Sequence, residues 1–261
     1  MMGIARRRVF ALAFLCVAIA GVLAGGEPAP IRVLFIGNSY TGVNDLPQMI
    51  AELAKAARQR PFEFDTETPG SCTLEKHWKD GKAARKIAGG KWDFVVLQEQ
   101  SMRPLLDPGL MFDYAIRLQG AIAEHGAKTI LYQTWARQGE IEKQAELSKA
   151  YLDLGKQLKV IVAPVGMAWE RALRDDPKLA LHSADKSHPS KAGSYLAACV
   201  LYSTIYCRSA EGLPGKIGGL GGAEVGKLQA IAWKTVRRLT VIHDGTGSSP
   251  NVQTDPHLFF P

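Results

Sequence analysis

The chain has 261 residues, of which 46% are hydrophobic and 22% are charged. This length and composition suit one well-buried α/β domain and are short for two domains. The formal net charge of +7 falls to +4 if Arg6, Arg7 and Arg8 are removed with a signal segment. Because no long basic run remains, the sequence does not predict a nucleic-acid partner.

The first 24 residues have the pattern of a secretory signal peptide. Three consecutive arginines precede an apolar run from Val9 to Ala24, and Gly25 and Gly26 follow it. An apolar run of this length could also stay as an uncleaved membrane anchor. We expect cleavage after residue 24, export to the periplasm or the cell exterior, and no stable membrane association of the cleaved protein.

Five short apolar or β-branched runs alternate with longer helical patterns along the rest of the chain. A strand followed by a helix, repeated several times, predicts right-handed crossovers and a mostly parallel sheet with helices on both faces. We expect one domain over residues 25–243, with Asp45 as the N-cap of its first helix, and an irregular tail over residues 244–261. The expected strands are 31–36, 62–66, 94–97, 129–132 and 160–163, and the expected helices are 46–58, 109–124, 140–157, 191–206 and 223–239.

Polar residues follow the predicted strands, at the edge where open parallel sheets bind their ligands. Ser39 comes after the first strand in the run Gly-Asn-Ser-Tyr-Thr-Gly over residues 37–42. A serine at a tight strand-to-helix turn is exposed, and the helix N-terminus beyond it favours developing negative charge. The run lacks the Gly-x-Ser-x-Gly elbow and the glycine-rich nucleotide motifs, and by itself it also fits an ordinary turn.

A second polar run lies far downstream, over residues 183–190. Asp185 precedes His188 by three residues, so its carboxylate can reach the ring, fix the tautomer and stabilise a protonated imidazole. The alternatives are a solvated loop, or metal ligation by His182, Asp185 and His188. Three ligands at that spacing would need a continuous helix, which the flanking serines and proline interrupt, so we expect no metal.

Ser39 and the Asp-x-x-His-Pro segment that contains His188 resemble the first and last sequence blocks of the SGNH (GDSL-like) hydrolase superfamily. The resemblance extends from Ile31 to about Tyr206. It implies a three-layer α/β/α sandwich with a mostly parallel, five-stranded, flavodoxin-like sheet, and an esterase that needs no cofactor. By this resemblance Ser39 is the nucleophile, His188 is the general base and Asp185 orients that base.

The resemblance also implies an oxyanion hole. The family's donors are the backbone N–H of the nucleophile, a glycine N–H after the second strand and an asparagine side chain after the third. Ser39 and Gly70 occupy the first two of these places, and Gln100 falls where the asparagine belongs. A glutamine amide can donate the same hydrogen bond from a longer stem, and Gln98 is the next candidate.

Two departures from the family pattern concern the first and third blocks. Asn38 replaces the aspartate of the name motif, and residues 98–101 read Gln-Glu-Gln-Ser in place of Gly-x-Asn-Asp. A Gly-Asn-Ser opening with a Leu-Gln-Glu-Gln-Ser third block resembles a variant branch of the superfamily with poorly defined function. This branch resemblance supports the fold and the nucleophile and leaves the substrate open.

Other polar residues at the same edge are candidates for substrate contact: Gln98, Trp135 and Arg137. Trp135 could stack on a sugar or acyl group while Arg137 holds an anionic one. Packing of Trp135 on a loop and solvation of Arg137 fit the sequence equally well. Glu99 could be catalytic, but a salt bridge to Arg103 is the simpler expectation.

Cys72, Cys199 and Cys207 remain after removal of the signal segment. An odd number of cysteines in an oxidising compartment allows at most one disulfide among them. Cys199 and Cys207 would lie about 12 Å apart along a helix axis, too far to pair unless the helix ends between them. A bridge from Cys72 to one of them stays open.

The sequence therefore predicts an exported serine esterase that forms an acyl-enzyme on Ser39. The expected partner is a small-molecule or glycan ester, and O-acetylated glycans are the preferred class because of the expected location and the polar edge. Two alternatives keep the fold. One is a catalytically impaired glycan-binding protein, and the other is an O-acyltransferase that passes the acyl group to a hydroxyl.

Overall fold

The computed structural model describes residues 28–214 and 220–243. The predicted signal segment, residues 1–24, and the predicted tail, residues 244–261, lie outside the described residues. Within the described ranges, no helix has both the length and the apolar character to cross a bilayer.

The core of the fold is a parallel sheet of five strands with the order β2-β1-β3-β4-β5. This order reverses direction at β1, as in flavodoxin-like sheets, and ligands bind such sheets at the carboxyl ends of the strands near that point. The predicted fold class is confirmed. The strands are β1 (Ile31–Ile36), β2 (Phe62–Glu67), β3 (Phe94–Leu97), β4 (Lys128–Tyr132) and β5 (Ile161–Ala163).

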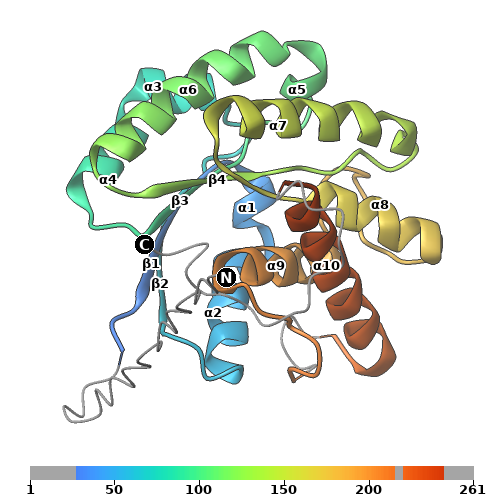
Figure 1. The fold of residues 1–261 in the computed structure, drawn as a ribbon. Helices are drawn as coiled ribbons and strands as arrows, with labels where there is room; N and C mark the ends of the chain where they lie inside the picture. Colours follow the sequence, from blue (N-terminus) through green and yellow to red (C-terminus); the bar gives the residue numbers. More distant parts are fainter. Residues whose placement is uncertain (1–27, 215–219, 244–261) are drawn as a thin grey trace, which may run out of the picture.

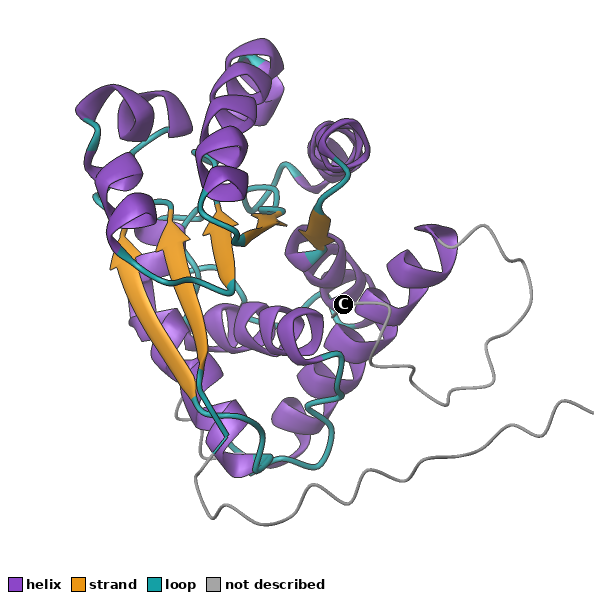
Figure 2. Cartoon of the chain, turned by 60° about the vertical axis from the view of Figure 1, so that its left-hand side comes forward, coloured by secondary structure: helices purple, strands orange, loops and turns teal. Residues whose placement is uncertain are grey.

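Helices cover both faces of the sheet and make three layers (Figures 1 and 2). One layer holds α3 (Leu74–Asp80), α4 (Lys82–Gly89), α6 (Pro108–Glu124) and α7 (Gln144–Leu158). The other holds α2 (Leu46–Ala56), α8 (Val165–Asp175), α9 (Lys191–Tyr206) and α10 (Gly222–His243). The short helical turns are α1 (Ser39–Gly42), η1 (Val43–Asp45), α5 (Arg103–Leu106) and η2 (Ile141–Lys143).

Strand β1 is apolar at nearly every position because both of its faces are buried. Val33 and Phe35 belong to the core on the α2 and α9 side, whereas Leu34 and Ile36 belong to the core on the α4 and α6 side. Successive side chains of a strand point to opposite faces, so a strand covered on both faces must be apolar on both. The two cores together hold the end of β1, and the residues that follow it, in one place.

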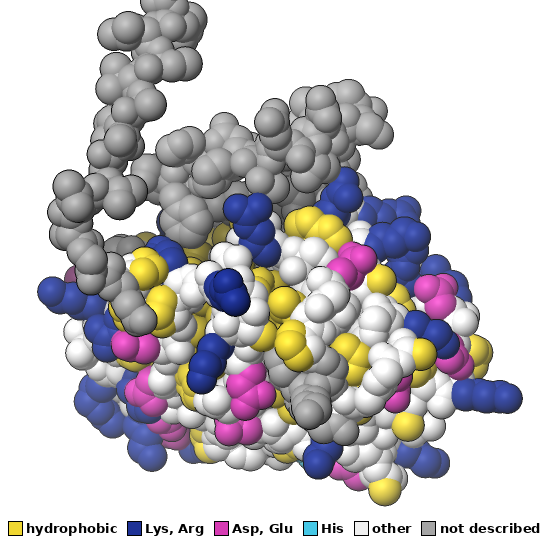
Figure 3. All heavy atoms as spheres, turned by 90° about the horizontal axis from the view of Figure 1, so that it is seen from below, with side chains coloured by type: hydrophobic (Ala, Val, Ile, Leu, Met, Phe, Trp, Pro, Cys, Tyr) yellow, Lys and Arg dark blue, Asp and Glu magenta, His cyan; other side chains and the backbone are white. Residues whose placement is uncertain are grey.

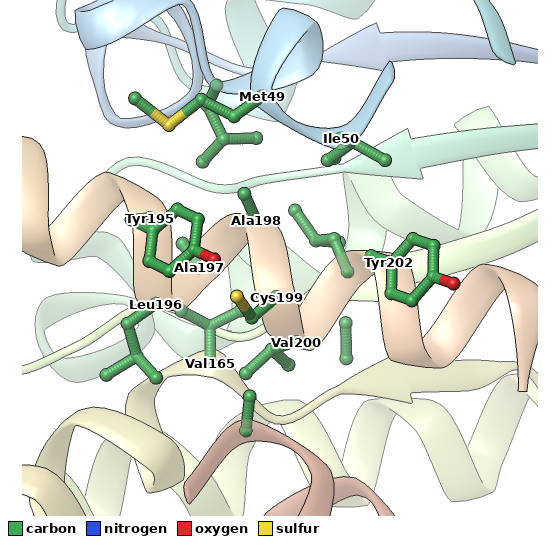
Figure 4. Packing of buried hydrophobic residues seen from close by; sticks show 14 of the residues in the cluster. Met49, Ile50, Val165, Tyr195, Leu196, Ala197, Ala198, Cys199, Val200 and Tyr202 are labelled. Carbon is green, nitrogen blue, oxygen red and sulfur yellow. The ribbon is translucent and has the colours of Figure 1, made fainter. Parts of the chain in front are cut away.

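Helix α9 is buried around nearly its whole circumference. It packs between α2 and α10, and Figure 4 shows Met49 and Ile50 on one side of it and Val165 on the other. Such a helix has no amphipathic stripe, because every face is turned to the core. Helix α9 therefore gives a rigid base to the loop that precedes it, which carries Asp185 and His188.

The structure differs from the expected elements in several places. Asp45 is the N-cap residue of α2, as expected, but it is left-handed, with φ of 53°, and its side chain makes no capping hydrogen bond. Pattern reading also missed α3, α4 and α8. Helices α3 and α4 are short and meet at Gly81, which adopts φ of 69°, so neither is long enough for a clear helical period.

All three cysteines of the described residues are free thiols. Cys72 and Cys199 are buried, and Cys207 caps the C-terminal end of α9.

On the face seen from below in Figure 3, Lys and Arg side chains lie mostly around the periphery, with Asp and Glu among them.

Candidate active site

Ser39 lies at the carboxyl end of β1, where α1 begins. The chain turns sharply because Asn38 is extended and its side-chain Oδ1 accepts a hydrogen bond of 3.0 Å from the Tyr40 N–H. This N-cap satisfies one free donor of the helix start. The turn brings the Ser39 hydroxyl out of the sheet toward the loop before α9.

Ser39, His188 and Asp185 form a hydrogen-bonded row. His188 Nε2 lies 2.8 Å from Ser39 Oγ, although 149 positions separate the two residues. His188 Nδ1 contacts Asp185 Oδ2. With Nδ1–H donated to the carboxylate, Nε2 is free to accept the serine proton, which is the geometry of a nucleophile activated by a base.

The Asp185 carboxylate is held by several donors. Its Oδ1 accepts the backbone N–H groups of Ser187 at 3.0 Å and His188 at 2.9 Å. The hydrogen bond from the His188 ring and these two N–H groups lower the pKa of Asp185 to about 2. Asp185 therefore remains ionised at neutral pH and can stabilise a protonated His188. The two side chains keep 50% and 36% of their surface exposed, so the row is open to solvent.

The loop that carries this pair is fixed at both ends. The Ser183 N–H donates to the His188 carbonyl at 2.8 Å, and the Gln138 N–H donates to the Lys186 carbonyl at 2.9 Å. His182 Nε2 donates to the Ala136 carbonyl at 3.0 Å. Among residues 28–214 and 220–243, no group of His, Cys, Asp and Glu side chains is placed to hold a metal ion.

Gln98 lies beneath the Ser39 turn and is fully buried. Its Oε1 accepts the Asn38 N–H and the Thr41 hydroxyl, both at 3.0 Å. Its Nε2 donates to Asn38 Oδ1 at 3.0 Å and to the Glu99 carbonyl at 2.6 Å. Every polar atom of the amide is engaged, so the position of Gln98 does not match the expected substrate contact or a third oxyanion donor.

Glu99 is a buried carboxylate that joins two loops of the site. Its Oε1 accepts the Gln100 N–H at 2.6 Å and the Leu74 N–H, at the start of α3, at 3.2 Å. Burial raises the pKa of Glu99 to about 7, because low dielectric surroundings disfavour the charged form. The expected salt bridge to Arg103 is wrong, since the Arg103 guanidinium pairs with Glu75 at 3.3 Å.

Two backbone donors are available near the turn. Neither the Ser39 N–H nor the Gly70 N–H donates a hydrogen bond to another group among the described residues. A methyl group added to Gly70 would meet no atom within 4 Å, which places this residue at an open part of the surface. The oxyanion role of both N–H groups stays a prediction.

Gln100 is engaged in its own loop. Its Oε1 accepts the N–H groups of Met102 at 2.8 Å and Arg103 at 3.2 Å, at the start of α5. Its Nε2 lies 3.3 Å from Ser101 Oγ. The side chain therefore caps α5. Its Nε2 group has a second N–H besides the one on Ser101, and its role as a donor to the oxyanion stays a prediction.

Trp135 is packed inside the protein. Its ring stacks on Tyr40 with 4.4 Å between centroids and on Trp169 with 4.0 Å, and it is 1% exposed. Its Nε1 donates to the Ser187 carbonyl at 3.1 Å. The expected stacking on a substrate does not match this position, because both ring faces are covered. Trp135 instead links the Ser39 turn to the His188 loop.

Sequence reasoning missed His77, which holds the Ser39 turn from below. Its Nε2 donates to the Gly37 carbonyl at 2.7 Å, and the ring is buried. Burial lowers the pKa of His77, so the neutral ring with Nε2 protonated is favoured. His77 lies within a short helix and 40 positions from its partner, so no local pattern in the sequence points to it.

Solved structures share this fold. A protein from Slackia heliotrinireducens assigned to the SGNH hydrolases is 28% identical, with a TM-score of 0.59 and coverage of 67% of this chain and 99% of that protein. A DUF4886 family protein from Bacteroides uniformis is 19% identical, with a TM-score of 0.65 and coverage of 80% and 95%. A lipase/acylhydrolase from Enterococcus faecalis is 18% identical, with a TM-score of 0.57 and coverage of 68% and 96%.

No protein-family model matches the sequence, and no curated protein matches it. The strand order and the structural similarities nevertheless agree with each other. The chain belongs to the SGNH-type hydrolase superfamily, and its fold is the α/β fold of those proteins.

Proposed function

We propose that this protein is an exported serine esterase with Ser39 as nucleophile, His188 as general base and Asp185 as the residue that orients it. The observation that carries the proposal is the 2.8 Å contact between Ser39 Oγ and His188 Nε2, with the second ring nitrogen on Asp185. A hydroxyl on an oriented, neutral imidazole is the arrangement from which serine enzymes attack carbonyl groups.

The proposed reaction has two steps. His188 Nε2 takes the Ser39 proton while Ser39 Oγ bonds to the ester carbonyl carbon, and the N–H groups of Ser39 and Gly70 hold the oxyanion. The alcohol leaves with the proton from His188. Water then attacks the acyl-enzyme, His188 takes its proton, and the acid leaves as Ser39 is restored. O-acetylated glycans are the preferred substrates, in keeping with the predicted export.

A fluorophosphonate probe tests the proposal, because it labels only an activated serine. The wild-type protein should be labelled and should hydrolyse aryl esters. Ser39→Ala should lose labelling and lower kcat on the order of 10⁴-fold or more, with an unchanged melting temperature. Ser209→Ala, in the loop after α9, is the matched control and should be labelled like the wild type.

The same experiment separates the alternatives. A folded wild-type protein that takes up no probe would be a binding protein that has kept the fold and lost the reaction. Labelling with full activity in Ser39→Ala would place the nucleophile elsewhere. An O-acyltransferase would be labelled like a hydrolase, so product analysis with and without an acceptor sugar is needed to recognise it.

A further inference from the structure

A polar cluster borders the Ser39–His188 pair and is not used by the proposed reaction. We call it the Arg137 cluster, and it consists of Tyr40, Ser101, Arg137 and Ser187. The Arg137 Nη2 lies 3.4 Å from Ser101 Oγ, and the Tyr40 hydroxyl lies 2.7 Å from Ser187 Oγ and faces Ser101 and Arg137. Tyr40 follows Ser39 and Ser187 precedes His188 in the chain, and the Tyr40 and His188 ring centroids lie 5.7 Å apart, so the cluster adjoins the proposed nucleophile and base.

Arg137 has no counter-charge among the residues that the structure describes. Its guanidinium takes part in none of the ion pairs found over residues 28–214 and 220–243. Its Nε is buried and has no hydrogen-bond partner in that part of the chain. Arginine taken out of water is normally paired, because an uncompensated buried charge is costly.

Arg103 gives the contrast at the same edge of the sheet. It also follows a strand end, but its guanidinium is matched by Glu75 at 3.3 Å. The charge of Arg103 is therefore satisfied within the protein. Within the described part of the chain, the Arg137 guanidinium faces the hydroxyl groups of Ser101 and Tyr40, which can share a bound anion but cannot neutralise a cation.

From this arrangement we infer that the substrate carries a carboxylate close to its ester bond, and that Arg137 binds this carboxylate with the hydroxyl groups of Ser101 and Ser187. The planar guanidinium matches a carboxylate with two parallel hydrogen bonds. The inference rests on the proposed esterase function and narrows its substrate class to anionic esters, among them esters of acidic sugars.

Arg137 also belongs to a segment that supports the His188 loop, since the neighbouring Gln138 N–H donates to Lys186. A purely structural role would change the hydrolysis of all esters by the same factor. The informative quantity is therefore the ratio of kcat/KM for an anionic ester to kcat/KM for its neutral partner.

Two ester pairs measure this ratio. In the first pair, 4-nitrophenyl hydrogen succinate carries a carboxylate on the acyl part and 4-nitrophenyl butyrate is its neutral partner. In the second pair, 4-carboxyphenyl acetate carries the carboxylate on the alcohol part and phenyl acetate is its neutral partner. For at least one pair, Arg137→Gln should lower the ratio by about 10- to 100-fold, since a charge-assisted bidentate contact is lost. Arg137→Lys should give an intermediate ratio, because a point charge replaces the fork. Arg103→Gln, the matched control, should leave the ratio unchanged.

Binding without turnover provides an independent measurement. Calorimetric titration of Ser39→Ala with the two anionic esters should show binding of at least one of them, and adding Arg137→Gln should weaken that affinity about 10-fold or more. An unchanged ratio for both pairs in both Arg137 variants, or equal affinity in the titration, would overturn the inference. If the esterase proposal is wrong, the wild-type protein takes up no fluorophosphonate probe. The titration would still decide whether Arg137 binds a carboxylate.

Discussion

Asn38 and Gln98 exchange hydrogen bonds in both directions beneath the nucleophile turn. The Asn38 N–H donates to Gln98 Oε1, and Gln98 Nε2 donates to Asn38 Oδ1, each at 3.0 Å. The side-chain Nδ2 of Asn38 donates to the Cys72 carbonyl at 3.0 Å, in the loop that contains Gly70. The two departures from the family pattern, asparagine in the first block and glutamine at the start of the third, are thus parts of one network.

Asn38→Asp should destabilise the protein even though it restores the aspartate of the superfamily motif. An aspartate keeps the acceptor for Tyr40 and Gln98, but it cannot donate to the Cys72 carbonyl and places a charge at a position that is 3% exposed. We expect a loss of about 1–3 kcal/mol in the free energy of unfolding, measured by urea denaturation. A stability equal to the wild type would show that the Cys72 contact has no net effect.

Asp185→Asn should lower kcat on the order of 10⁴-fold while leaving the fold intact, because an amide favours the wrong tautomer of His188 and does not stabilise its protonated form. The pKa of Asp185 is about 2, so the carboxylate is ionised at every pH where the enzyme is assayed. Protonation of Asp185 should therefore not appear in the pH–rate profile above about pH 4. If the activity of the wild type falls at acidic pH and this fall is absent only in Asp185→Asn, Asp185 is not ionised throughout the assayed range.

Gln100→Ala distinguishes a capping role from an oxyanion role. If Gln100 only caps α5, as its contacts with Met102 and Arg103 indicate, the variant should lose about 1 kcal/mol of stability and keep its kcat per folded molecule. If the amide moves to the oxyanion when substrate binds, kcat should fall by roughly 10²–10³-fold with little change in KM. Steady-state kinetics and the melting temperature of the same preparation decide between the two.

Glu99→Gln should stabilise the protein at alkaline pH and have little effect at acidic pH. The pKa of Glu99 rises from an ordinary value of 4.5 to about 7 in the folded protein. The folded state holds this proton to a higher pH than the unfolded chain, so the wild type loses stability as pH rises through this interval, by up to about 3 kcal/mol. A glutamine keeps the acceptor oxygen for Leu74 and Gln100 without the charge.

Urea unfolding of the wild type and of Glu99→Gln at pH 5 and pH 8 measures this difference. Glu75→Gln is the control, because the hydrogen bond from Lys79 and the charge of Arg103 lower the pKa of Glu75 instead. The control should show no gain of stability at pH 8. If the difference in stability between Glu99→Gln and the wild type is the same at both pH values, Glu99 titrates normally.

The apolar and polar patterns along the chain were enough to predict the architecture and the contact between Asp185 and His188. Strand β1 is apolar on both faces, which only a sheet covered on both sides can satisfy, and parallel strands bring the residues after them to one edge. Asp185 and His188 are three positions apart, so their contact depends on local geometry. These features depend on periodicity and short spacings, which a sequence displays directly.

The contacts of the polar side chains at that edge, in contrast, could not be predicted from the order of residues along the chain. Gln98 turned beneath the nucleophile because Asn38 and Thr41, 60 and 57 positions away, offer partners there. Trp135 became a packing residue because Tyr40 and Trp169 cover both of its faces. A side chain in a loop takes its direction from neighbours distant in sequence, since buried amides and indoles must find partners wherever the fold supplies them.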